Sequence, residues 1–270
     1  MSGAAAAVGP RRRGLWLAVA ALTGLLVALA CGSQAWAMVN RHTASRTYVL
    51  PHPVRTVEVY AGTGDISVVP GRPDRADRVD VSEKLAWSTA RPRVVQTWVG
   101  DTLQLHTGCT GGGFFLLHAL QCQVSLVISV PPATAVFVST ADGSVEVRGV
   151  SGDVTTRTGS GTTHLVGLRG DVSARASSGD IDAEALRSAR TSAQAGSGSI
   201  ELQYASAPRS VSTLTGSGSS EIVVPRGRTF RVGGASGSGN RYVQPGLDDP
   251  DSAATLTLTA GSGATSAHYG

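Results

Sequence analysis

Four acidic residues at matching positions are the first candidates for chemistry. Each lies three places after a glycine turn, and together they form an acidic ladder: Glu146, Asp182, Glu201 and Glu221. If successive turns stack, Glu201 and Glu221 have Cα atoms ~5 Å apart, which resembles the carboxyl spacing of a retaining glycosidase. Any two stacked residues share this spacing, so we favour a solvated polar face over a catalytic pair or a cation site.

The other patterns that support catalysis or cofactor binding are missing from the sequence. The six His residues, at positions 42, 52, 106, 118, 164 and 268, are scattered, and none pairs with another at metal-site spacing. G-x-G recurs without the third glycine of a dinucleotide site, and neither G-x-x-x-x-G-K-[ST] nor G-x-S-x-G occurs. We therefore predict no catalytic residue, no cofactor and no metal site.

Two cysteines are placed to form a disulfide. Cys109 and Cys122 flank T-G-G-G-F-F-L-L-H-A-L-Q, between two expected strands. In an oxidising compartment a bridge is the default, and it would contribute about 3 kcal/mol by the chain-entropy model. A thiolate metal site lacks two further ligands, so we predict a Cys109–Cys122 disulfide.

A repeated glycine turn must position these residues. From Ala141 onward the turn reads A-D-G, G-S-G, S-S-G and then G-S-G four times. Its last glycine falls at Gly143, Gly161, Gly179, Gly198, Gly218, Gly239 and Gly263, so the intervals run from 18 to 24 residues. A period near 20 with short β-prone segments is typical of a solenoid. Glycine suits the turn because a sharp reversal often needs a positive φ.

Alternation on both sides of each turn predicts the strands. After Gly198, for example, the apolar Ile200 and Leu202 enclose the polar Glu201, which is the period of a half-buried strand. Small inward residues such as Ala174 and Ala193 leave room for only a thin core. We predict an all-β fold, a single-stranded two-sheet β-solenoid of ~18–24-residue coils stacked ~4.8 Å apart.

The residues before the repeat are expected to form longer, irregular coils that cap the stack. Val57–Pro70 carries one more copy of the turn, and Val79–Trp87 is the first of several further alternating segments. Between the two cysteines lies the most apolar stretch outside the N-terminal segment: Phe114, Phe115, Leu116 and Leu117. We favour this stretch as part of the cap; the alternative is an exposed loop that docks a protein or a lipid surface.

The N-terminal segment predicts a transmembrane helix. Residues 14–39 carry no charge, and as a helix they would place Trp16 and Trp36 ~30 Å apart, close to the hydrocarbon thickness of a bilayer. Arg11–Arg13 place the N-terminus inside. We therefore expect a cytoplasmic tail (1–13), an anchor (14–39), a linker (40–56) and an extracytoplasmic solenoid domain (57–270) on a single-pass membrane protein.

Two alternatives to the anchor remain open, and both also export the domain. One is a signal peptide cleaved after Ala37, and the other is a lipoprotein signal ending at Cys31. Nucleic acid is not an expected partner: without Arg11–Arg13 the 23 basic residues fall to 20, against 19 acidic ones.

The sequence resembles a known family in its Arg-flanked anchor, its V-E-V-Y-A-G-T-G-D-I-S-V segment, its cysteine pair before V-S-L-V-I-S-V-P and its repeated S-G-D-[VI] and G-S-G turns. It looks like the bacterial putative-adhesin family of unknown function, whose β-solenoid is also called a toastrack domain. The resemblance covers about Tyr48 to the C-terminus and implies a non-enzymatic cell-envelope surface module for adhesion or for protein or glycan interaction. The alternative is a regulatory accessory of an envelope-stress or membrane sensor system, and a polysaccharide-active enzyme ranks third.

Overall fold

The computed structural model describes residues 10–39, 42–50, 52–72, 78–88, 91–108 and 122–270. The chain divides into two compact units, one ending at His42 and one running from Thr43 to Gly270. The first contains helix α1 (Pro10–Val39), which begins inside the segment predicted as a cytoplasmic tail. Within the described residues, no helix combines the length and the hydropathy of a membrane-spanning segment. The anchor predicted over residues 14–39 is therefore not confirmed.

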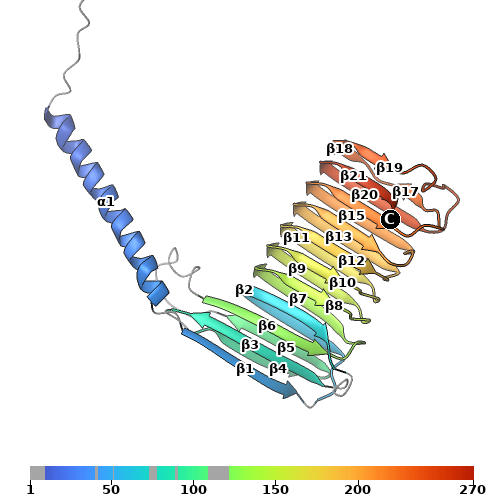
Figure 1. Cartoon of the computed structure of the whole chain (residues 1–270), viewed down its shortest axis with the longest axis horizontal. Helices are drawn as coiled ribbons and strands as arrows, with labels where there is room; N and C mark the ends of the chain where they lie inside the picture. The colour runs from blue at the N-terminus through green and yellow to red at the C-terminus, as the bar shows by residue number, and fades with distance from the viewer. Residues whose placement is uncertain (1–9, 40–41, 51, 73–77, 89–90, 109–121) are drawn as a thin grey trace, which may run out of the picture. The chain divides into compact units, whose positions relative to one another are not determined.

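The second unit confirms the predicted all-β solenoid with two sheets (Figure 1). Strands of successive coils pair parallel and in register, so that Ile181 lies beside Ile200, and Leu202 beside Ile222. Ile200 and Leu202 are each only 1% exposed, whereas Glu201 between them is exposed. The strand register derived from the turn glycines is therefore confirmed.

Each regular coil contributes one strand to each sheet. In spatial order, sheet A consists of β1 (His42–Leu50), β3 (Val79–Trp87), β6 (Cys122–Val130), the second half of β2 (Thr56–Pro70), β8 (Val145–Arg148), β10 (Thr163–Val166), β12 (Ile181–Leu186), β14 (Ile200–Tyr204), β16 (Ser220–Val224), β21 (Thr265–Tyr269) and β19 (Arg241–Val243). Sheet B consists of β4 (Arg93–Val99), β5 (Thr102–Gly108), the first half of β2, β7 (Ala135–Asp142), β9 (Val154–Ser160), β11 (Val172–Ser178), β13 (Arg190–Ser197), β15 (Ser210–Ser217) and β20 (Thr255–Ser262), followed by β17 (Arg231–Gly233) and β18 (Ser236–Ser238).

The coils leave chain order at both ends of the stack. At the C-terminal end, β20 and β21 pair with β15 and β16, so the coil of β17–β19 lies outermost. At the other end, β2 lies between β7 on one side and β5 on the other. Beyond it, β3 and β4 pair antiparallel with β6 and β5. The residues before the repeat thus form the irregular terminal coils that were predicted.

The prediction of a linker over residues 40–56 is wrong for most of its length. Residues His42–Leu50 form strand β1, which pairs with β3. The Tyr48 hydroxyl donates a hydrogen bond of 2.6 Å to Oε1 of Glu83, a carboxylate that is only 6% exposed. Sequence alternation does not reveal β1, because most of its side chains face solvent.

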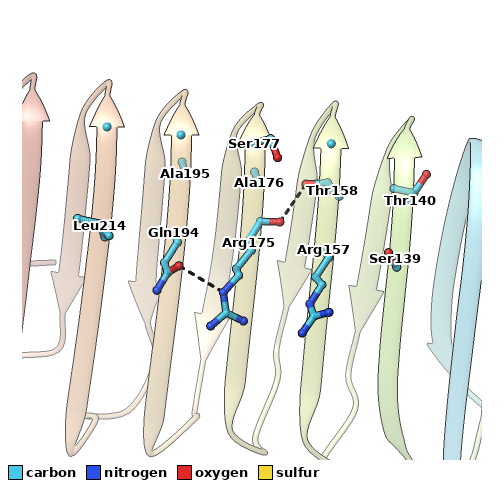
Figure 2. Close-up of a pocket in the computed structure, with 13 residues that line it drawn as sticks. Ser139, Thr140, Arg157, Thr158, Arg175, Ala176, Ser177, Gln194, Ala195 and Leu214 are labelled. Atoms are coloured by element: carbon cyan, nitrogen blue, oxygen red, sulfur yellow. Dashed lines mark hydrogen bonds between the residues drawn. The ribbon is translucent and has the colours of Figure 1, made fainter.

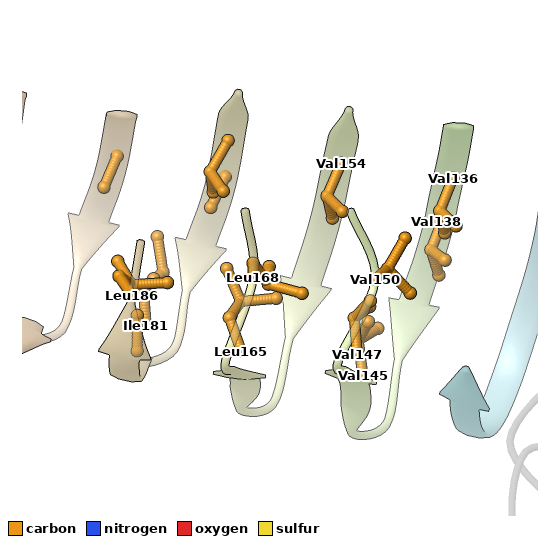
Figure 3. Close-up of a cluster of buried hydrophobic side chains, with 14 of the residues drawn as sticks. Val136, Val138, Val145, Val147, Val150, Val154, Leu165, Leu168, Ile181 and Leu186 are labelled. Carbon is orange, nitrogen blue, oxygen red and sulfur yellow. The ribbon is translucent and has the colours of Figure 1, made fainter. Parts of the chain in front are cut away.

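The core is thin and aliphatic, as Figure 3 shows for the coils around Val147 and Leu165. Most inward positions are filled by Val, Leu, Ile, Ala and Thr. Three fully buried residues fill bends between the two sheets: Val150, Leu168 and Leu186. The two sheets are therefore held close together, and each turns its other face to solvent.

The turn glycines are required for two reasons. Most of them have positive φ, including Gly161 (118°) and Gly218 (139°), although Gly179 does not. In addition, a Cβ on Gly218 would lie 2.1 Å from the carbonyl oxygen of Gly198 in the adjacent coil. Both the backbone conformation and the stacking distance therefore exclude a side chain at this turn.

Candidate functional site

A groove runs along the outer face of sheet B, across successive coils (Figure 2). One wall of the groove is a column of side chains that occupy the same register position on successive strands. The floor of the groove is formed by the residues that lie two positions closer to the glycine turn on each of these strands. The column consists of Ser139, Arg157, Arg175, Gln194 and Leu214, and the floor includes Gly159, Ser177, Gly196 and Gly216. The groove has a volume of ≈ 750 Å³ and is open to solvent.

The floor is low because most of its positions cannot hold a side chain. A Cβ on Gly196 would lie 2.4 Å from the carbonyl oxygen of Ser177, and a Cβ on Gly216 would lie 2.5 Å from that of Gly196. Real Cβ atoms do not approach oxygen so closely, so a side chain at either position would require the backbone to shift. Exposed backbone and small residues therefore lie directly beside the wall.

Two arginines are the charged groups of the groove. Arg157 and Arg175 are exposed neighbours on β9 and β11. Arg175 donates hydrogen bonds of 3.3 Å to Oε1 of Gln194 and to Oγ of Ser173. The Arg157 guanidinium carbon lies 5.3 Å from the ring centroid of Phe137, a cation–π distance. Among the described residues, neither arginine forms an ion pair with a carboxylate.

This arrangement favours an anion between the two guanidinium groups. The backbones of adjacent parallel strands are ~4.8 Å apart. The positively charged side chains of Arg157 and Arg175 therefore repel each other when no anion lies between them. A carboxylate, sulfate or phosphate group would relieve this repulsion, and the guanidinium forks match the geometry of such groups.

An aromatic cluster continues the same face beyond Arg157. Tyr60 stacks on His106 with ring centroids 4.7 Å apart and planes at 6°, and its ring lies 5.4 Å from that of Phe137. The Tyr60 hydroxyl donates to Glu58, which also accepts a 2.9 Å hydrogen bond from Gln104. Partial burial and the hydrogen bond to Glu58 raise the pKa of Tyr60. The cluster therefore places aromatic rings and the Glu58 side chain on the same face as the arginines.

The acidic ladder lies on the opposite sheet, on the outer face of sheet A. Its four members share one in-register column with His164: Glu146, His164, Asp182, Glu201 and Glu221. Arg148 forms an ion pair with Glu146, and its hydrogen bond lowers the pKa of that carboxyl group. His268 Nε2 lies 3.6 Å from Oε1 of Glu221. The ladder is thus a partly paired surface outside the groove.

The register brings together three potential metal ligands that the sequence analysis did not predict. The ligand atoms of His164, Asp182 and Glu184 all lie within 4.8 Å of one another, and His164 Nδ1 lies 3.0 Å from Oδ2 of Asp182. These three residues can hold a cation. In the structure, His164 Nδ1 and Asp182 Oδ2 already form a hydrogen bond with each other. His164 and Asp182 each lie three residues after a turn glycine, so the glycine alignment already makes them neighbours in β10 and β12, and Glu184 lies two residues beyond Asp182.

The other predicted site residues are only partly described. Cys122, the first residue of β6, is disulfide-bonded, whereas Cys31 is free. Cys109 and the predicted docking loop, Phe114 to Leu117, lie outside the described residues. The Cys109–Cys122 pairing and the role of the loop therefore stay predictions, and a non-reducing peptide map would test the first.

The sequence analysis also missed the two arginines, although a signal for them exists. Both lie four residues before a turn glycine, in T-R-T-G-S-G and A-R-A-S-S-G. The coil pattern places this position on the outer face of sheet B, so their proximity follows from the same alignment that revealed the acidic ladder.

Comparison with known proteins agrees with the coil architecture. The family model described as Toastrack DUF4097 matches residues 53–229. The chain belongs to this family. The match begins just before β2 and extends beyond β16, so it includes the groove, the acidic ladder and the coils that carry them. No curated protein matches the chain.

Several solved structures are similar to this toastrack protein at low sequence identity. A "putative adhesin" from Parabacteroides distasonis is 10% identical, covers 83% of this chain and 97% of its own, and has a TM-score of 0.46. A "putative adhesin" from Bacteroides fragilis is 11% identical, with 84% and 97% coverage and a TM-score of 0.44. A "putative lipid binding protein" from P. distasonis is 13% identical, with 85% and 97% coverage and a TM-score of 0.37.

Proposed function

We propose that this toastrack protein is a non-enzymatic interaction module of the cell envelope, whose groove on sheet B binds an anionic partner. One observation carries the proposal: Arg157 and Arg175 lie side by side at the groove with no carboxylate partner among the described residues. Arginines with a purely structural role, when buried or constrained, normally pair with a carboxylate. Two exposed arginines that are neighbours and have no carboxylate partner are suited to the recognition of an anion.

The composition of the groove supports binding rather than catalysis. The described residues that line it are Arg, Gln, Ser, Thr, Gly, Ala and Leu, with no acid, His or Cys among them. General acid–base chemistry requires a titratable group within reach of the substrate, and a Ser or Thr nucleophile requires an adjacent base. The carboxylates of the acidic ladder lie on the other sheet and cannot act on a ligand held beside Arg157.

An envelope location is proposed from the sequence. The uncharged residues 14–39, the Trp16–Trp36 spacing and the preceding Arg11–Arg13 favour a helix that holds the toastrack domain outside the membrane. A surface location suits the adhesion role that the names of several similar structures suggest. In the alternative role, as a regulatory accessory, the anionic partner would be one membrane protein.

A binding assay with an acidic polysaccharide tests the proposed site. We expect the full chain, in neutral detergent, to bind polygalacturonate but not uncharged dextran. R157Q/R175Q should weaken this binding at least about tenfold, since each charge-assisted contact contributes roughly 1.5–3 kcal/mol. R187Q/R209Q is the matched control, because both of these arginines are exposed and neither lines the groove. Equal binding by the two double variants would rule out the groove as the site.

A further inference from the structure

On the central coils, the outer faces of the two sheets carry charged groups of opposite sign. On sheet A, Asp182, Glu201 and Glu221 occupy three consecutive coils of one column. Glu184 adds a fourth carboxylate two residues beyond Asp182, and Arg148 is paired with Glu146. On sheet B, Arg157 and Arg175 have no carboxylate partner among the described residues. On these central coils, the charged groups without a close partner of opposite sign are therefore carboxylates on sheet A and guanidinium groups on sheet B.

The charges on the two faces also share one spacing. Each coil contributes one strand to sheet A and one to sheet B, so neighbouring side chains on either face repeat at the same ~4.8 Å interval. Two acids on adjacent coils of one molecule can therefore meet two arginines on adjacent coils of another, one for one.

We propose that the anionic partner of the groove is the acidic ladder of a second copy of this chain. The inference rests on the proposed function, because it names an occupant for the same groove. Glu201 and Glu221 are the best-suited contacts: Glu201 is exposed, and Glu221 has only a 3.6 Å contact with His268. The other two acids of the ladder already interact more closely, Asp182 with His164 and Glu146 with Arg148.

The geometry of this contact allows copies to be added without limit. The groove and the ladder are different surfaces on different sheets, so the contact is heterologous and leaves each outer copy with one free face. Exposed ion pairs are individually weak, typically below about 1 kcal/mol, so the free protein should associate only at high concentration. Confinement of many copies to one membrane surface would raise their effective concentration and favour lateral or cell-to-cell clustering.

Charge reversal with complementation tests the inference. The self-association of the full chain in neutral detergent would be followed by sedimentation velocity. R157E/R175E has two acidic faces, E201R/E221R has two basic faces, and each should lose self-association at least about tenfold. An equimolar mixture of the two variants should regain it, because the reversed faces complement each other. High salt should dissociate the wild type, since the Debye length falls from ~10 Å at 0.1 M to ~3 Å at 1 M.

The outcomes separate this inference from the proposed function. R187E/R209E is the control and should associate like the wild type, because its charges lie outside the groove. A wild type that stays monomeric at all concentrations, or a mixture that fails to associate although both variants melt like the wild type, would overturn the inference. If polygalacturonate still bound through Arg157 and Arg175, the groove would remain an anion site with a different occupant. If the chain neither self-associated nor bound polygalacturonate through Arg157 and Arg175, both proposals would be refuted.

Discussion

At the scale of single residues, the turn glycines are fixed by the neighbouring coil. Gly218 has a φ of 139°, and an added Cβ would lie 2.1 Å from the carbonyl oxygen of Gly198. We expect Gly218→Ala to lower the free energy of unfolding by about 3 kcal/mol or more. Gly62→Ala is the matched control, with no atom within 4 Å of the added Cβ, and should cost less than about 0.5 kcal/mol. Urea denaturation would compare them, and equal losses would contradict the stacking.

The strand register predicts opposite responses at two adjacent residues. Leu202 is 1% exposed between the sheets, so Leu202→Asp would bury a carboxylate and should cost several kcal/mol. Glu201 is exposed on the outer face, and Glu201→Ala should change the stability by about 0.5 kcal/mol or less. Thermal melting of both variants measures the difference. Greater damage from Glu201→Ala would mean that the register is wrong by one residue.

At the scale of elements, strand β1 is tied to the terminal coils by the hydrogen bond from Tyr48 to Glu83. Because Glu83 is buried, Tyr48→Phe should lower stability by roughly 1.5–3 kcal/mol. Burial and this hydrogen bond raise the pKa of Tyr48, so the folded state keeps its proton while the unfolded state loses it above about pH 10.

The sign of the pH effect follows from linkage. Above about pH 10 the unfolded state binds fewer protons at Tyr48, so stability falls as the pH rises. Urea denaturation at about pH 8 and about pH 11 would measure the fall. Tyr48→Phe should show a smaller fall than the wild type, and an identical fall would assign the effect to other groups.

Sequence reasoning succeeded where the determinants are local. The turn glycines and the alternation around Glu201 predicted the coils, the buried columns and the position of the acidic ladder. Strand β1 and the position of the coil of β17–β19 outside β20 and β21 depend on pairing between distant segments. Arg157 and Arg175 share one outer column of sheet B, so the same glycine alignment is sufficient to predict that they are neighbours.

At the scale of the whole molecule, the proposed role requires that the toastrack domain be held at the envelope. We expect the protein to stay with membranes after alkaline extraction, because a helix of the uncharged residues 14–39 can lie in the hydrocarbon core of the bilayer. N-terminal sequencing provides the check. A mature chain that begins at Met38 would support signal cleavage after Ala37, and a diacylglyceryl group on Cys31 would support lipidation.

Arg157 and Arg175 are proposed to form the anion-binding site of the domain. The most direct test of this claim is to modify arginines of the native full chain with a dicarbonyl reagent, with and without polygalacturonate, and to map the products by mass spectrometry. We predict that the polyanion protects Arg157 and Arg175, while the exposed Arg187 and Arg209 react as before. Protection of all four to the same extent, or of Arg187 and Arg209 instead, would contradict the claim.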